Sequence, residues 1–136
     1  MAYTPTHGRL TVLKVNALDI SLATKTSTFS GSADVHDTSG YGLTNRTKVG
    51  GLIDGKFTAS GSYDVGTVTG TAIVLEGKEG VTQPIIRQIQ GTGTTKPQES
   101  FSGVLAKFDV SDPVDDIVTW AAEWEVTGVV NRAAQP

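Results

Sequence analysis

Strict alternation of apolar and polar residues is clearest near the end of the chain. Over residues 118–126 every second position is apolar: Val118, Trp120, Ala122, Trp124 and Val126. The positions between them carry Thr119, Ala121, Glu123 and Glu125. A repeat of two over this length is typical of an antiparallel strand that buries one face and leaves the other in water.

Weaker alternation predicts further strands upstream. Residues 56–63 place Phe57, Ala59, Gly61 and Tyr63 on one side. Residues 67–76 alternate in the same way, and residues 101–110 place Val104, Ala106, Phe108 and Val110 on one face. Shorter extended stretches are expected over residues 10–15 and 19–29. Residues 84–90 fit either a strand or one helical turn between Thr82 and Gly91, and we favour the strand.

Three segments have no clear periodicity. Residues 1–9 are polar and contain a proline and a glycine, so we expect an N-terminal arm. Residues 31–51 contain five glycines and form a long loop in this interpretation, which a compact domain tolerates when the loop has a function. Residues 131–136 are expected to be a C-terminal tail. The division is therefore one β domain over residues 10–130 between two short ends.

Composition strengthens the β prediction. The 136 residues include 19 Thr and 15 Val, which are stiff at χ1 and suit a pleated sheet, and 16 Gly and 5 Pro punctuate the chain. Six or seven strands at this spacing predict an all-β fold, an antiparallel two-sheet sandwich or partial barrel, with one short helix as the alternative at residues 84–90.

The net charge and the absence of cysteine argue against several classes of protein function. The formal net charge of −3 argues against a dedicated nucleic-acid binder, which usually carries a basic face. The absence of cysteine excludes a thiolate metal site and cysteine catalysis. No apolar run approaches the roughly 20 residues of a membrane helix, and residues 1–9 lack the apolar stretch of a signal peptide. We therefore expect a soluble chain that does not act at a membrane.

No residue set has the pattern of an active site. Ser32, Asp34 and His36 alternate, but same-face neighbours on one strand stand about 6.5–7 Å apart, too far for a hydrolytic triad. Asp34, His36 and Asp37 lack the regular spacing of a calcium loop. Residues 91–96 depart from the phosphate-loop pattern in spacing. We expect no catalysis, no metal and no cofactor.

The two tryptophans allow two interpretations. Trp120 and Trp124 share a face with apolar neighbours, which favours two core indoles that pack between sheets. The alternative is a platform on which a carbohydrate stacks, which requires at least one indole to be exposed in a groove.

Three blocks of the sequence resemble the major tail (tail tube) proteins of long, non-contractile-tailed bacteriophages, the siphophages. Residues 51–64 are similar to the family's GL-x-DG … SG-x-YD strand, and residues 32–42 look like the segment that enters its long loop. Residues 113–128 are similar to its closing strand. Together the blocks cover roughly residues 10–76 and 99–130, and their order and spacing carry the match.

The resemblance implies a structural virion protein and several partners. Six copies would form a ring, and rings would stack into a tube through which DNA passes without specific binding during ejection. The tape measure protein and the tail-end proteins would be further partners. The location would be the virion tail, after synthesis in the host cytoplasm.

Under this resemblance two groups of residues have expected roles. The first group would contact the adjacent ring: Asp34, His36, Asp37, Tyr41, Asn45, Arg46 and Lys48. The second would line the channel, where a neutral-to-acidic surface does not trap phosphate: Ser60, Ser62, Thr67, Thr69, Thr71, Glu123 and Glu125. The alternatives are a capsid decoration protein or another virion β-sandwich, and a carbohydrate-binding module.

Overall fold

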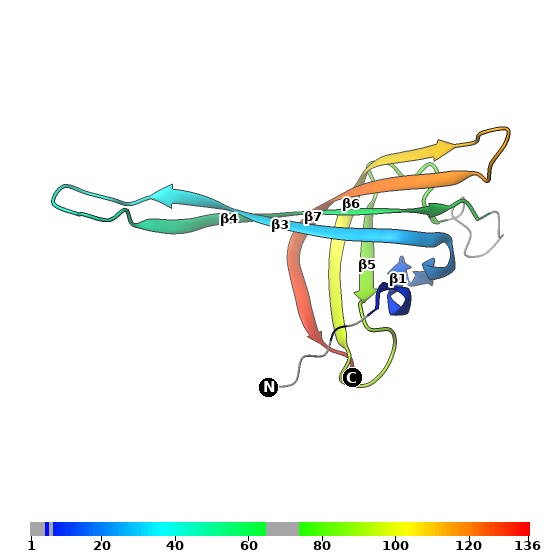
Figure 1. Cartoon of the computed structure of the whole chain (residues 1–136), viewed down its shortest axis with the longest axis horizontal. Coiled ribbons are helices and arrows are strands. Elements are labelled where there is room, and N and C mark those ends of the chain that lie inside the picture. The colour runs from blue at the N-terminus through cyan, green and yellow to red at the C-terminus, as the bar shows by residue number, and fades with distance from the viewer. Residues whose placement is uncertain (1–4, 6, 65–73) are drawn as a thin grey trace.

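The computed structural model describes residue 5, residues 7–64 and residues 74–136. The described strands are all antiparallel and form one seven-stranded sheet in the order β2-β1-β5-β6-β7-β4-β3 (Figure 1). The strands are β1 (Val12–Val15), β2 (Leu18–Asp19), β3 (Thr24–Asp37), β4 (Lys48–Ser62), β5 (Thr82–Gln88), β6 (Pro97–Ser111) and β7 (Thr119–Ala134). Two short 3-10 helices, η1 (Gly8–Leu10) and η2 (Ser21–Ala23), precede β1 and β3.

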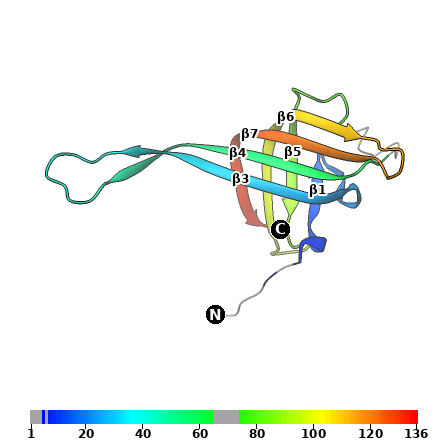
Figure 2. The same ribbon diagram turned by 45° about the horizontal axis from the view of Figure 1, so that its top comes forward.

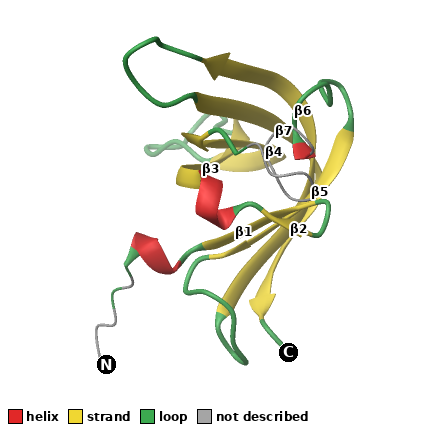
Figure 3. Cartoon of the chain, turned by 90° about the vertical axis from the view of Figure 1, so that its right-hand side faces the viewer, coloured by secondary structure: helices red, strands yellow, loops and turns green. Residues whose placement is uncertain are grey.

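The sheet bends so strongly that it makes two layers (Figure 3). The hairpin layer contains β3, β4, residues 119–125 of β7 and residues 107–111 of β6. The short-strand layer contains β1, β2, β5 and the other halves of β6 and β7. The expected all-β, antiparallel fold is confirmed, and its two layers belong to one continuous sheet.

Strands β6 and β7 change layer where their register shifts. The shifts lie between Ser100 and Ser102 and between Leu105 and Lys107 of β6. Extra residues at such bulges bend a strand and increase its twist. Gly128 of β7 has φ of +82°, which is a left-handed conformation that favours glycine. The bulges therefore let the same two strands serve both layers.

The hydrophobic core lies between the two layers. Phe57, Trp120 and Trp124 of the hairpin layer are buried, as the alternation over residues 56–63 and 118–126 predicts. The Phe57 ring lies 5.4 Å from the Phe101 ring and 5.5 Å from the Trp124 ring, measured between centroids. The facing aliphatic side chains are those of Leu13, Val15, Ile85 and Leu105.

Polar atoms inside the core have partners. Trp124 Nε1 donates to Gln83 Oε1 at 3.0 Å, and Gln83 Nε2 donates to the Val74 carbonyl at 3.0 Å. Trp120 Nε1 donates to the Ala23 carbonyl at 3.1 Å. A Cβ at Gly61 would lie 1.9 Å from that same carbonyl oxygen. Only glycine at position 61 lets β4 pass so close to the start of β3.

Three expectations need correction. Residues 31–51 are mostly strand, because β3 runs to Asp37 and β4 begins at Lys48. The expected tail from residue 131 is largely β7, which pairs with β6 up to Ala134, and Gln135 is buried. The face expected over residues 101–110 is wrong in its first half, where Phe101 and Leu105 are buried, since the bulge at Leu105/Lys107 changes the phase.

Of two further strand predictions, one is confirmed and the other lies mostly outside the described residues. Residues 82–88 form β5, which confirms the strand rather than the helical turn. The predicted strand over residues 67–76 lies mostly outside the described residues.

Candidate functional site

The most prominent feature outside the core is a long arm made by β3 and β4. It projects well beyond the body of the molecule (Figures 1 and 2). β4 pairs with β7 only from Lys56 onward, so its first eight residues have β3 as their described strand partner. Both faces of the arm are exposed from Ser30 to Asp54.

All seven residues expected to contact another ring lie on this arm: Asp34, His36, Asp37, Tyr41, Asn45, Arg46 and Lys48. The arm ends in an ordered turn, where the Thr38 N–H donates to the Thr47 carbonyl at 2.8 Å. Hydrogen bonds from the Ser39 side chain and from the Ser39 N–H, which donates to Asp37 Oδ1 at 2.8 Å, lower the pKa of the Asp37 carboxyl. Arg46 Nη1 lies 3.9 Å from Asp37 Oδ2.

Large apolar side chains on the arm have no cover within the described structure. Tyr41 is fully exposed, and Val35, Val49, Leu52 and Ile53 are each more than half exposed. An apolar surface of this kind usually marks a binding site. Tyr41 was among the residues expected to contact another ring. The four aliphatic residues could not be recognised from the sequence, because a strand that is exposed on both faces has no reason to alternate.

A second feature is the polar outer face of the hairpin layer. Four of the residues expected to line a channel lie together on it: Ser60 and Ser62 of β4, and Glu123 and Glu125 of β7. In register, Lys56 faces Glu125, Thr58 faces Glu123 and Ser60 faces Ala121. Thr67, Thr69 and Thr71 lie outside the described residues.

Charges on this polar face neutralise one another. Lys56 Nζ lies 2.8 Å from Glu123 Oε1, and this hydrogen bond raises the pKa of Lys56. Lys107 Nζ of β6 lies 3.4 Å from Asp109 Oδ2. Glu125 adds a further negative charge beside Lys56. A shallow hollow on the face is lined by residues of all four strands, among them Thr26, Ser60, Lys107 and Glu123, so the face is concave.

The hairpin layer has two free edges. β3 is the last strand of the sheet and pairs with β4 alone among the described strands. On the other side, β5 pairs with β6 only as far as Val104, so residues 107–111 of β6 have β7 as their described strand partner. Free edges present unpaired N–H and C=O groups to other chains.

Three groups of residues bear on catalysis, metal binding and carbohydrate binding. Ser32, Asp34 and His36 are all exposed on the arm. In the described part of the chain, no group of three or more His, Cys, Asp or Glu side chains is placed to hold a metal ion. Trp120 and Trp124 are 2% and 0% exposed, which contradicts the carbohydrate platform. None of the described helices has the length and apolar character that crossing a membrane requires.

This chain is similar to known proteins in its fold. No family model and no curated protein matches it. Solved structures do match, although their sequences are only 12% to 13% identical to this chain. A chain of the virion of a native gene transfer agent particle has a TM-score of 0.74, with 96% of this chain and 100% of that chain covered.

Two further structures match along almost the whole chain. A chain from the tail of an empty gene transfer agent particle, determined with C6 symmetry, has a TM-score of 0.72 and 12% identity over 96% of this chain and 100% of its own. The SPP1 tail tube protein has a TM-score of 0.74 and 13% identity over 96% of this chain and 80% of its own. The chain therefore has the tail tube fold.

Proposed function

We propose that this protein is the structural subunit of a phage-type tail tube, in which six copies form a ring and the rings stack around a DNA channel. One observation carries the proposal: the hairpin layer is a four-stranded sheet with a concave polar face and two free edges. Within the described residues of one molecule these edges have no strand partner, and repeated copies would pair them.

The two free edges are suited to each other. Successive strands in the layer alternate in direction, so β3 at one edge runs opposite to β6 at the other. The β3 edge of one copy can therefore continue the antiparallel sheet beside β6 of the next copy. Such head-to-tail contacts close into a ring when the rotation between copies allows. The C6 symmetry of the similar gene transfer agent tail supports six copies.

Closure of the sheet would place the concave polar face inward, because the inside of a barrel is its concave side. On this face Lys56 and Lys107 already have acidic partners, and Lys25 lies at the β3 edge, where it lines the neighbouring hollow. A channel that bound phosphates through free cations would hold DNA by releasing its counterions. We propose Ser60, Ser62, Glu123 and Glu125 as lining residues, and Thr67, Thr69 and Thr71 as further ones.

The arm would join successive rings. Its exposed apolar side chains and the seven residues named above would contact copies in the adjacent ring. In this proposal the protein resides in the virion tail after synthesis in the host cytoplasm, and the tape measure and tail-end proteins are its further partners. It is structural rather than catalytic and uses no cofactor.

Electron microscopy of the purified protein tests the proposal. We expect six-fold rings and hollow tubes in negative stain at high protein concentration. A capsid decoration protein, the main alternative, would instead give monomers or trimers. Persistent monomers or trimers across a range of salt and protein concentrations would contradict the tail tube assignment.

A further inference from the structure

An apolar groove lies where the arm leaves the body. It runs between the base of the β3–β4 arm and the second half of β7, and its volume is about 590 Å³. Its apolar side chains include those of Phe29, Ile53, Val126 and Val129. Three glycines, Gly31, Gly55 and Gly128, leave part of its wall without side chains. Ile53 and Val129 are 84% and 79% exposed, so apolar surface remains uncovered in the single chain.

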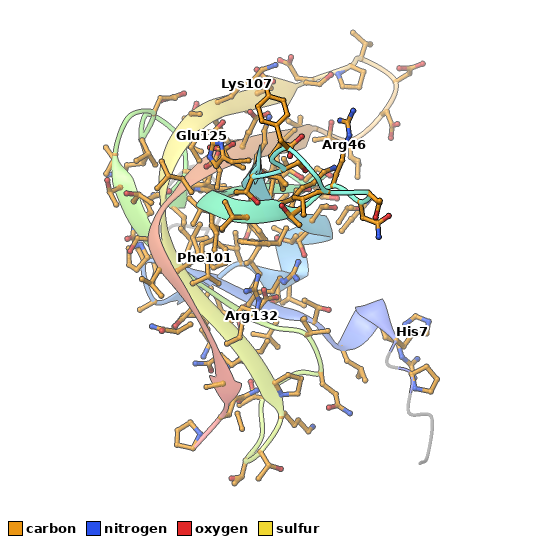
Figure 4. The ribbon with its side chains drawn as sticks, turned by 90° about the vertical axis from the view of Figure 1, so that its left-hand side faces the viewer. His7, Arg46, Phe101, Lys107, Glu125 and Arg132 are labelled. Atoms are coloured by element: carbon orange, nitrogen blue, oxygen red, sulfur yellow. The ribbon has the colours of Figure 1, made fainter. Side chains whose placement is uncertain are left out.

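A fixed positive charge borders this groove. Arg132 Nε donates to Glu99 Oε2 at 3.2 Å, and the guanidinium carbon lies 5.2 Å from the centroid of the Phe29 ring. These two contacts set the orientation of a side chain that is still 58% exposed. Figure 4, which looks at the end of the molecule that carries the arm, shows Arg132 below the arm. The groove thus offers an apolar surface with one oriented cation.

The opposite end of the molecule carries a matching protrusion. The turn between β6 and β7, residues 112–118, lies at the far end of the long axis from the arm (Figure 1). Val114 is fully exposed at 107%, and Ile117 is 55% exposed. Asp112, Asp115 and Asp116 flank them, and the turn has no basic residue. It offers two apolar side chains beside three carboxylates.

We propose that this turn of one copy docks into the groove of a copy in the next ring. Val114 and Ile117 would cover the apolar wall of the groove. The aspartates of the turn would face Arg132 and would point away from Asp54, a residue of like charge that also lines the groove. Stacking rings head to tail brings the arm-bearing end of one copy to the turn-bearing end of another, which is the required approach. The inference rests on the proposed tail tube and names the contact that joins its rings.

Engineered cysteine pairs test this contact directly, because the natural chain has no cysteine. The test variant carries Val114→Cys and Val129→Cys. Each copy then presents one thiol on its turn and one in its groove, so mild oxidation of preformed tubes should link copies in series. We expect a ladder of dimers, trimers and longer chains on a non-reducing denaturing gel.

Two controls separate docking from random contact. The single variants Val114→Cys and Val129→Cys should give dimers at most. Leu22→Cys with Val129→Cys places an equally exposed thiol elsewhere on the molecule, since Leu22 is 103% exposed, and should give no ladder.

The outcomes distinguish this inference from the proposed function. Tubes seen by microscopy before oxidation, with a ladder only for the Val114/Val129 pair, support both. Tubes without a ladder, or with an equal ladder for the Leu22 control, overturn the docking contact and leave the tail tube standing. A chain that forms neither rings nor tubes under any condition overturns both.

A second variant removes the apolar contact without touching the core. Val114→Asp with Ile117→Asp changes two exposed side chains, so the circular dichroism spectrum should match the natural protein. We expect rings that fail to stack. Tubes of normal length from this variant would contradict the inference.

Discussion

At the scale of single residues, Glu99 ties three strands together. Its carboxylate is 9% exposed and lies 2.6 Å from Arg87 Nη2 of β5 and 3.2 Å from Arg132 Nε of β7. Arg87 also lies over the Phe57 ring, 5.8 Å from its centroid. A carboxylate that is buried with its partners cannot be removed without leaving a charge unpaired.

Replacing this carboxylate should therefore destabilise the monomer strongly. For Glu99→Ala we expect the free energy of unfolding to fall by about 3 kcal/mol, because Arg87 would remain 15% exposed without its partner. The control is Asp109→Ala, which removes an ion pair whose side chains are 65% and 60% exposed and should cost less than about 1 kcal/mol. Urea unfolding measures both, and equal effects would contradict the structural role of Glu99.

Some residue roles could be predicted from sequence and others could not. The buried Trp120 and Trp124 follow from strict alternation, which reports burial directly. The need for glycine at position 61 does not follow, because it depends on the Ala23 carbonyl, which is 38 positions away along the chain. Gln83 is similar: it is fully buried, yet only the fold shows that Trp124 and Val74 satisfy its amide.

At the scale of elements, strands that pack on one face were predicted and strands exposed on both faces were not. Residues 56–63 and 118–126 alternate because the core selects every second side chain. The arm does not pack on a core, so its sequence does not alternate and indicated a loop. The last part of β7 was missed because residues 131–134, which pair with β6 through their backbone, carry no alternating hydrophobic pattern.

The exposed edge of β3 allows a matched pair of variants. Neighbouring residues in a strand point their N–H groups to opposite sides. Of the two variants Ser27→Pro and Thr28→Pro, one therefore removes an N–H that donates to β4. The other removes an N–H that points away from β4 at the free edge. We expect the variant that loses the donor to β4 to destabilise the monomer. The variant that loses the donor on the free edge should keep a nearly unchanged urea midpoint but should not form rings. Rings from both variants would contradict closure through β3.

The turn of the arm can be tested separately from its strands. Replacing residues 40–47 with a short Gly-Ser linker removes Tyr41, Asn45 and Arg46 but leaves the β3–β4 pairing in place. We expect an unchanged strand content by circular dichroism and rings that do not grow into tubes. Tubes of normal length in negative stain would remove these three residues from the contact between rings.

At the scale of the whole molecule, the polar face determines what an assembled tube offers to DNA. Two of its lysines, Lys56 and Lys107, are held by acidic partners, and Glu125 adds a negative charge beside Lys56. The sequence predicted that Ser60 and Ser62 share one side of their strand and that Glu123 and Glu125 share one side of theirs. It could not predict that the face is concave or that it lies on the layer with free edges, because both depend on how the sheet bends.

Reversing one charge on this face should affect DNA passage without affecting assembly. Glu125→Lys adds a cation to the proposed channel, where it would retain phosphate. We expect normal particle yield and tail length with reduced delivery of DNA, measured as infectivity per particle. Glu79→Lys is the control, because it makes the same charge change on an exposed residue that does not line the hollows of the polar face. Equal infectivity of the two variants would remove Glu125 from the channel lining.

The continuity of β6 and β7 through both layers has a mechanical consequence. In a sandwich of two separate sheets, side-chain contacts and connecting loops resist sliding of one sheet over the other. Here covalent backbone crosses the bend twice, so the layers cannot shear apart unless the bulges near Leu105 and Gly128 are pulled straight. A tube built from such subunits would transmit a bending force from its wall to its outer surface along peptide bonds, and its stiffness would not depend on core packing alone.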